Sequence, residues 1–314
     1  MLERYFTLRP YLLSKIRDFF NNGGYIEVET PYVVPTVPPD PHIEPLLVYI
    51  GDVGPYFLHT SPEIYMKKIL ARGLKRIYQI CRAFRLENKD ELHSLEFTML
   101  EWYREGSCME ALKETERLVD FLSSSLESDF GIKKSFSPPF RIFDMEELFL
   151  ERLNISPFNH EKMEFYIALK EKNIVSVRED DSWLDMFFKA FFERIEPSID
   201  KSTPYFITGW PIHLSSMAKA KDGKAERFEL YVRGVEIANG YSELLDPTEQ
   251  RKRFEEDNNR RKMMGKREFI IDGDFISCLS KIEGEYSGCA VGVERLMMVL
   301  LGEEDIDRVS PFNL

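Results

Sequence analysis

The 314-residue sequence has little of what disulfide-rich, metal-binding and membrane proteins need. Its four cysteines form no C-x-x-C pair and have no histidine at metal-ligand spacing, so neither a disulfide framework nor a zinc site is expected. No apolar run reaches the roughly 18 residues of a membrane span, and the N-terminus has no signal-peptide core. These absences predict a cytoplasmic protein that does not contact a membrane.

Basic residues are outnumbered by acidic ones, 42 against 54. The formal net charge is −12 and the isoelectric point is near 5.1, whereas a phosphate backbone favours clustered Lys and Arg. Broad nucleic-acid binding is therefore not expected. The one basic run, residues 251–267, holds eight Lys or Arg against three acids. We interpret it as a solvated helix face, with docking of an acidic protein partner as the alternative.

The remaining composition is that of a globular chain with a large core, since 43% of the residues are apolar and 24 are Phe. No linker interrupts the sequence, so we expect a single domain over residues 1–314.

Periodicity and turn residues predict helices over 8–21, 62–72, 108–125, 183–195 and 248–264. They predict strands over 25–30, 56–60, 76–85 and 93–103, a proline-rich loop over 35–45, a hairpin over 227–246, and a strand running into a helix over 287–302. This order lacks a βαβ rhythm, which favours an α+β fold with an antiparallel sheet.

Residues 84–103, FRLENKDELHSLEFTMLEWY, are the first candidate for a binding site. Side chains alternate on a strand, so one face would collect His93, Phe97, Glu101 and Tyr103. Arg85 suits a phosphate because its guanidinium is permanently charged and offers a planar fork of donors, and an aromatic ring beside it can stack on a base. Taken alone, such a pattern is more often a solvated sheet face.

Two later stretches carry further candidates. Glu229, Glu236 and Glu243 recur every seven residues across the predicted hairpin, where they can converge on a divalent cation or an ammonium group. A wet acidic edge is the alternative. In GCAVGVERL (288–296), glycines allow a ligand to approach the backbone, and Arg295 falls in the first turn of a helix, where amides and a guanidinium can bind the same phosphate.

These stretches, in this order, resemble the motifs of the class II aminoacyl-tRNA synthetases. NNGGYIEVETP, ending at Pro31, resembles motif 1, which packs at a dimer interface in that family. FRLE with the H-x-x-x-F-x-x-x-E pattern after it resembles motif 2, and residues 288–296 resemble motif 3. TSPEIYMKK, EFTMLEWY and EIANGYSEL are most similar to the catalytic domain of lysyl-tRNA synthetase. The resemblance implies a class II synthetase-like antiparallel sheet flanked by helices, and a homodimer.

The chain is expected to lack the tRNA-binding β-barrel of lysyl-tRNA synthetase, because it begins directly at the helix before motif 1. It thus resembles the elongation factor P lysine ligases, which are similar to a lysyl-tRNA synthetase catalytic core and attach (R)-β-lysine to a lysine of elongation factor P. Ala290 supports this choice, since the ligases have alanine where lysyl-tRNA synthetases usually have glycine. Its methyl group would crowd an α-amine and tolerate an amine one carbon further along, a difference worth roughly 1–3 kcal/mol.

The resemblance implies a ligase that uses ATP with Mg²⁺, forms an aminoacyl-adenylate and transfers (R)-β-lysine to elongation factor P, without tRNA. Carried over by matching positions, the catalytic residues are Arg85 on the α-phosphate and Arg295 on the γ-phosphate. The implied ATP site comprises Arg85, Leu86, Glu87, His93, Ser94, Phe97, Glu236, Ile237, Gly292 and Arg295. The implied amino-acid site comprises Ser61, Pro62, Glu63, Glu101, Tyr103, Asn239, Tyr241, Glu243 and Ala290. Glu229 and Glu236 are implied to hold Mg²⁺ with ATP.

Three residues depart from the family pattern, namely Ser94 for asparagine, Glu91 for arginine and Glu294 for aspartate, and none removes the implied phosphate contacts. Two alternative functions stay open. One is a small lysyl-tRNA synthetase-like enzyme that acts on α-lysine. The other is a catalytically silent paralogue that binds a metabolite and regulates a partner, which would not need both arginines and Glu236.

Overall fold

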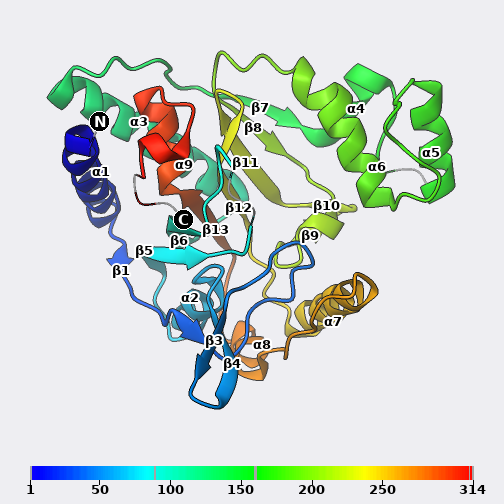
Figure 1. Cartoon of the computed structure of the whole chain (residues 1–314), viewed down its shortest axis with the longest axis horizontal. Helices are drawn as coiled ribbons and strands as arrows, with labels where there is room; N and C mark the ends of the chain where they lie inside the picture. Colours follow the sequence, from blue (N-terminus) through cyan, green and yellow to red (C-terminus); the bar gives the residue numbers. More distant parts are fainter. Residues whose placement is uncertain (1, 88–89, 159–160, 311, 313–314) are drawn as a thin grey trace.

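The computed structural model describes residues 2–87, 90–158, 161–310 and 312, and a large sheet forms its centre (Figure 1). The sheet has eight strands in the order β1-β5-β6-β13-β12-β11-β8-β7. Its interior pairs are antiparallel, whereas the outermost pairs, β1·β5 and β7·β8, are parallel. The predicted α+β fold with a mainly antiparallel sheet is confirmed. Of the polar connection expected over 86–92, residues 88 and 89 lie outside the described residues.

The helices and strands occur in the expected order along the chain. The strands of the large sheet are β1 (Ile26–Glu27), β5 (Arg76–Phe84), β6 (Glu96–Glu105), β7 (Arg141–Asp144), β8 (Tyr205–Thr208), β11 (Arg227–Val232), β12 (Val235–Ser242) and β13 (Tyr286–Gly292). Smaller sheets contain β2 (Val33–Val34), β3 (Leu47–Ile50) and β4 (Val53–Leu58), and β9 (Ala220–Lys221) with β10 (Lys224–Ala225). The helices are α1 (Leu2–Asn22), α2 (Glu63–Leu70), α3 (Cys108–Phe130), α4 (Met145–Leu153), α5 (Lys162–Glu171), α6 (Trp183–Ala190), α7 (Pro247–Met263), α8 (Gly273–Leu279) and α9 (Val293–Leu301).

Local sequence explains where several of these elements begin and end. α3 starts at a capping box on Ser107 and ends at Gly131, whose φ of 66° is left-handed. α7 starts behind Asp246, whose carboxylate accepts two backbone amides of the first turn. β11 and β12 are joined by Arg233 and Gly234, both at positive φ, which is the two-residue turn that suits twisted strands. The predicted hairpin therefore forms where glycine makes the turn possible.

The alternation of β6 separates the core from a cavity. Leu100 and Trp102 are fully buried in the main hydrophobic cluster with α1, α3 and α9, which lie together beside the sheet in Figure 1. Glu101 and Tyr103 alternate with them and line a cavity on the other face, next to α2. One strand thus supplies both packing and a binding surface.

A second hydrophobic cluster packs α4, α5 and α6 against the far end of the sheet (Figure 1). The aromatic helix expected over 183–195 is confirmed as core, and it continues past α6 as a π-helical turn over Phe191–Ile195. Phe206 of β8 belongs to the first cluster, whereas its neighbours Tyr205 and Ile207 belong to the second. Because the clusters share a strand, we propose that the chain folds as one domain.

Several expected element edges are wrong, among them those of β1 and β6. β1 covers only Ile26–Glu27 of the strand expected over 25–30. β6 begins at Glu96, so His93 does not lie on the strand and does not share its face by alternation. His93 lies in the preceding connection, where the Asp90 carboxylate accepts its backbone amide. Short polar side chains that bind nearby amides compete in this way with strand pairing.

The basic run over 251–267 is not simply a solvated helix face, because Arg253 and Arg261 are buried. Arg261 donates to both carboxylate oxygens of Glu44 at 2.9 Å and to carbonyl oxygens of the proline-rich loop over 35–45. It therefore ties α7 to that loop. The exposed basic side chains of the run are Arg251, Lys252, Lys262 and Arg267.

The four cysteines are free thiols. Within the described ranges, no helix combines the length and apolar character required to cross a bilayer. The same residues include no group of three or more His, Cys, Asp or Glu side chains that could hold a metal ion.

Candidate active site

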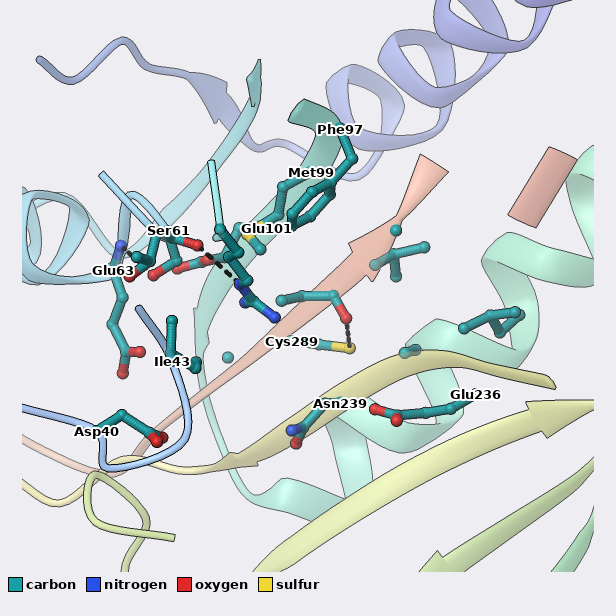
Figure 2. Close-up of a pocket in the computed structure, with 18 of the residues that line it drawn as sticks. Asp40, Ile43, Ser61, Glu63, Phe97, Met99, Glu101, Glu236, Asn239 and Cys289 are labelled. Carbon is teal, nitrogen blue, oxygen red and sulfur yellow. Dashed lines mark hydrogen bonds between the residues drawn. The ribbon is translucent and has the colours of Figure 1, made fainter. Parts of the chain in front are cut away.

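A cavity of about 360 Å³ opens between α2, the loop over 35–45 and the strands β6, β12 and β13. Figure 2 shows Phe97 and Glu101 along one strand, with Glu236 and Asn239 on a second strand across the space. The two ends of the cavity differ in their charged groups. Arg85 and Arg295 lie near each other at one end, where Glu87 and Glu236 accompany them, whereas Glu63, Glu101 and Glu243 gather at the other.

The strand register explains why three strands contribute to one pocket. Ala290 of β13 is paired with Glu101 on one side and with Asn239 on the other. Directly paired residues point to the same face of a sheet, so all three side chains face the cavity. The Ala290 methyl group consequently lies between a carboxylate and an amide.

Backbone carbonyls orient the two arginines. Arg295 donates from Nε to the carbonyl of Leu92 at 3.0 Å and from Nη1 to that of Glu236 at 3.2 Å. Arg85 donates from Nε to the carbonyl of Thr60 at 3.3 Å. A carbonyl carries no formal charge, so these bonds fix the guanidinium groups without neutralising them. This end of the cavity is suited to an anion with several oxygens.

An aromatic ring lies beside the arginines. The Arg85 guanidinium carbon is 5.3 Å from the centroid of Phe97, within the range of a cation–π contact. His93 contacts the Asp90 carboxylate through Nδ1 at 2.8 Å, and its Nε2 is 3.7 Å from Glu87. The combination of a flat ring, a guanidinium and polar groups at the rim matches what a nucleotide requires.

Carboxylates dominate the opposite end. Lys67 is fully buried, and its Nζ lies 2.7 Å from Glu63 and 2.5 Å from Glu243. Tyr241 donates its hydroxyl to Glu63 at 2.5 Å, and the hydroxyl of Tyr103 donates at 2.6 Å to the third carboxylate, Glu101. Two carboxylates thus contact one ammonium group, and a third, Glu101, lies close enough to be repelled by Glu63. The arrangement favours a further cation.

The buried carboxylates hold protons unusually tightly. Burial, together with repulsion from Glu63, raises the pKa of Glu101 to about 8. Burial also raises the pKa of Glu243 to about 8, although Lys67 opposes the shift. Oε1 of Glu243 is buried and has no hydrogen-bond partner among the described residues. An incoming ammonium group would restore both the charge balance and the missing hydrogen bond.

The absence of a side chain at Gly288 lets Tyr103 and Glu243 pack close to the β13 backbone. A methyl group on Gly288 would lie 2.5 Å from the Tyr103 ring and 2.7 Å from Oε1 of Glu243. Any larger residue there would push both side chains out of place. The first glycine of the stretch over 288–296 therefore shapes the acidic end, not the phosphate end.

The two carboxylates implied to hold Mg²⁺ lie near each other. Burial and the neighbouring Glu236 carboxylate raise the pKa of Glu229 to about 7. Glu229 is paired with the Arg227 guanidinium and accepts the Tyr231 hydroxyl at 2.6 Å, and it does not line the cavity. Glu236 does line it. Carboxylate oxygens suit Mg²⁺, so the Glu236 carboxylate, which faces the cavity, fits the ion, whereas Glu229 is engaged by Arg227 and Tyr231. Glu243 belongs to the acidic end instead.

The structure brings most predicted site residues together in one cavity. Of the predicted residues, those that do not line the cavity are Leu86, Pro62 and Glu229. The Leu86 side chain is exposed, and its backbone amide donates to the carbonyl of Glu44 at 2.8 Å. Pro62 lies at the start of α2, where it sets the backbone entry into the helix. The binding roles of these residues stay predictions.

Sequence reasoning missed several charged residues at the site, among them Lys67 and Arg227. Lys67 lies four residues after Glu63 on α2, a spacing that places the two on one helix face and could have indicated the pair. Arg227 also lines the cavity and donates from Nε to Asn239 at 3.1 Å. No local signal pointed to this second contact, because it depends on the pairing of β11 with β12.

Comparisons with known proteins agree with this geometry. The family model described as tRNA synthetases class II (D, K and N) matches residues 1–314. The chain is 35% identical to the elongation factor P–(R)-beta-lysine ligase of Edwardsiella ictaluri, over 98% of this chain and 94% of the relative. The corresponding ligase of Klebsiella pneumoniae is 36% identical, over 98% and 94%. A ligase homolog of Aquifex aeolicus is 34% identical, over 96% of each chain. The chain therefore belongs to the class II (D, K and N) tRNA synthetase family and, within it, to the elongation factor P–(R)-beta-lysine ligases.

Proposed function

We propose that this chain is an ATP-dependent ligase that activates (R)-β-lysine and transfers it to a lysine side chain of elongation factor P. The observation that carries the proposal is the polarity of the cavity. Arg85 and Arg295 lie at one end, and Glu63, Glu101 and Glu243 lie at the other. A diamino acid whose carboxylate reacts with a triphosphate needs this distribution of charge. The printed names of the relatives support the same substrate and target protein.

In the first step, a carboxylate oxygen of the amino acid attacks the α-phosphorus of ATP and pyrophosphate leaves. Arg85 neutralises charge on the α-phosphate and Arg295 binds the γ-phosphate, while Phe97 stacks on adenine. In the second step, the amine of the target lysine attacks the acyl carbon, AMP leaves and the amine loses a proton. No side-chain nucleophile is needed. Mg²⁺ at Glu236, with Glu229 behind it, supplies further positive charge when bound.

The enzyme is further proposed to be a cytoplasmic homodimer that does not bind tRNA. Motif 1 and the two residues after it expose Ile26, Tyr32 and Val33, each more than two-fifths accessible, which is unusual for apolar side chains close together in sequence. A partner subunit would cover them. The net charge of −12 disfavours a tRNA backbone.

Pyrophosphate exchange across a panel of amino acids tests the proposal, followed by intact-mass measurement of elongation factor P. Exchange should be fastest with (R)-β-lysine, and elongation factor P should gain the mass of one lysyl group. Faster exchange with α-lysine, or efficient charging of tRNA, would contradict it.

A further inference from the structure

A charged lysine lies directly behind the amino-acid end of the cavity, in contact with two of the carboxylates that line it. Lys67 is fully buried, whereas its neighbour on α2, Lys68, is partly exposed and pairs with Asp272. A buried ammonium must be matched by nearby charge or it becomes very costly. Here Glu63 and Glu243 match it, and their attraction raises its pKa despite burial. Lys67 is therefore a permanent cation at the site.

The packing of α2 holds this cation in place. Ile64, Met66 and Leu70 of the same helix are buried in the hydrophobic cluster that includes Phe254 and Phe275. Lys67 lies on the same buried face of the helix, between Ile64 and Leu70, and its Nζ lies 5.7 Å from the Tyr241 ring centroid. Rotating α2 to release the ammonium would expose that apolar surface. The position of Lys67 is thus fixed by the core.

The charges at this end can be counted. When ionised, Glu63, Glu101 and Glu243 contribute three negative charges, and Lys67 neutralises one of them. Two negative charges remain. The hydroxyls of Tyr103 and Tyr241 also contact the cluster, and they donate to Glu101 and Glu63. They satisfy carboxylate oxygens without changing the charge.

We propose that Lys67 is a specificity-determining positioning residue, which holds Glu63 and Glu243 in place and leaves two negative charges to match an amino acid with two ammonium groups. This inference rests on the proposed function, because it concerns the same cavity. A substrate with one ammonium group would leave one buried carboxylate unmatched. That carboxylate would have to take up a proton before the substrate could bind well.

Two analogues of β-lysine isolate the effect on the native enzyme. 6-Aminohexanoic acid lacks the amine near the carboxylate, and 3-aminohexanoic acid lacks the terminal amine. Each should support pyrophosphate exchange with kcat/KM lowered at least about 100-fold, because a site built for a charged amine penalises its loss strongly. Equal use of either analogue would overturn the proposal.

The variants K67M and K68M form a matched pair on one helix. K67M should raise KM for (R)-β-lysine at least about tenfold, leave KM for ATP unchanged and reduce the preference for the diamino acid over both analogues. K68M should resemble the native enzyme, because Lys68 pairs with Asp272 outside the cavity. A folded K67M with native KM and native preference would overturn the inference.

Should K67M not fold, the double variant K67M/E63Q carries the test, since it removes one ammonium and one carboxylate together. It should still prefer the diamino acid, with a raised KM. An equal response to β-lysine and 6-aminohexanoic acid would overturn the proposal. If the native enzyme activates no diamino acid at all, the proposed function itself fails, so the two failures are distinguishable.

Discussion

Ala290 is the residue on which the choice between two lysine isomers depends. Its methyl group lies between Glu101 and Asn239 in the strand register, where the family resemblance implies that the amine nearest the reacting carboxylate binds. Removing one methyl group typically changes discrimination by roughly 10- to 200-fold. We expect A290G to raise kcat/KM for α-lysine about tenfold relative to (R)-β-lysine, as measured by pyrophosphate exchange. An unchanged ratio would show that the methyl group does not read the position of the amine.

The carboxylates at the same end predict a pH dependence. Without substrate, Glu101 and Glu243 are protonated well above the ordinary carboxyl range, since burial raises the pKa of each to about 8. A diammonium substrate binds their ionised forms. KM for the amino acid should therefore fall as the pH rises from about 6.5 to about 8.5, while KM for ATP changes much less. A KM for the amino acid that does not vary over this range would contradict the assignment.

The raised pKa values of Glu101 and Glu243 also affect the stability of the ligand-free protein. Rising pH should lower this stability, although it improves binding of the amino acid. A carboxyl group whose pKa is higher in the folded state binds more protons there than in the unfolded chain. Its contribution is complete below the ordinary pKa of 4.5 and is lost as the pH rises toward about 8. The ligand-free protein should lose melting temperature over this range, and (R)-β-lysine should restore part of the loss. This thermal measurement is independent of catalysis.

At the scale of elements, α1 supports the nucleotide end from a distance. Arg9 on α1 donates to the Thr98 hydroxyl at 2.5 Å and lies 3.0 Å from Glu294, whose other oxygen accepts the backbone amide of Thr98 at 2.8 Å. Thr98 follows Phe97, and Glu294 precedes Arg295. The variant R9M leaves the buried Glu294 carboxylate with the more distant Arg82, 3.8 Å away, and the loss of a close buried ion pair typically costs about 3–5 kcal/mol. We expect a lower melting temperature and a several-fold higher KM for ATP, with KM for the amino acid unchanged.

Arg17 provides the control on the same helix. It pairs with Glu27 at 3.0 Å on the surface, where such pairs contribute at most about 1 kcal/mol. R17M should therefore leave both the melting temperature and KM for ATP close to native. If R9M and R17M behave alike, α1 does not position Phe97 and Arg295.

The same scale shows how far the sequence could predict the structure. Strong periodicity identified β6, α3 and the β11–β12 hairpin, and it placed Phe97, Glu101 and Tyr103 on one face because strand alternation is a local property. Periodicity placed His93 wrongly on this strand. The backbone amide of His93 donates to Asp90 instead, and β6 begins only at Glu96. Sequence reasoning read the basic run as solvated because the partner of Arg261, Glu44, is more than 200 residues away in sequence. Pairings of that kind are set by tertiary structure.

In the candidate site, too, some residues could be predicted from the sequence, whereas contacts between distant segments could not. The resemblance of the motifs implied the arginines, the aromatic ring and the carboxylates, and these line one cavity. The ion pairs of Lys67 were not predicted, because the second of them depends on Glu243, far along the chain. The role of Gly288 at the acidic end was missed for the same reason, since its neighbours Tyr103 and Glu243 come from other segments.

For the whole molecule, the open edge of the large sheet is the feature that bears on assembly. β1 is the terminal strand, paired with β5 on one side, and its Ile26 is 50% exposed. An exposed apolar edge strand invites pairing with another chain. We expect I26K to convert a dimer into a monomer in sedimentation velocity. The matched control is I167K on α5, because Ile167 is 51% exposed but far from motif 1 in sequence. Native protein that sediments as a monomer, or I167K that dissociates as readily as I26K, would rule out motif 1 as the interface.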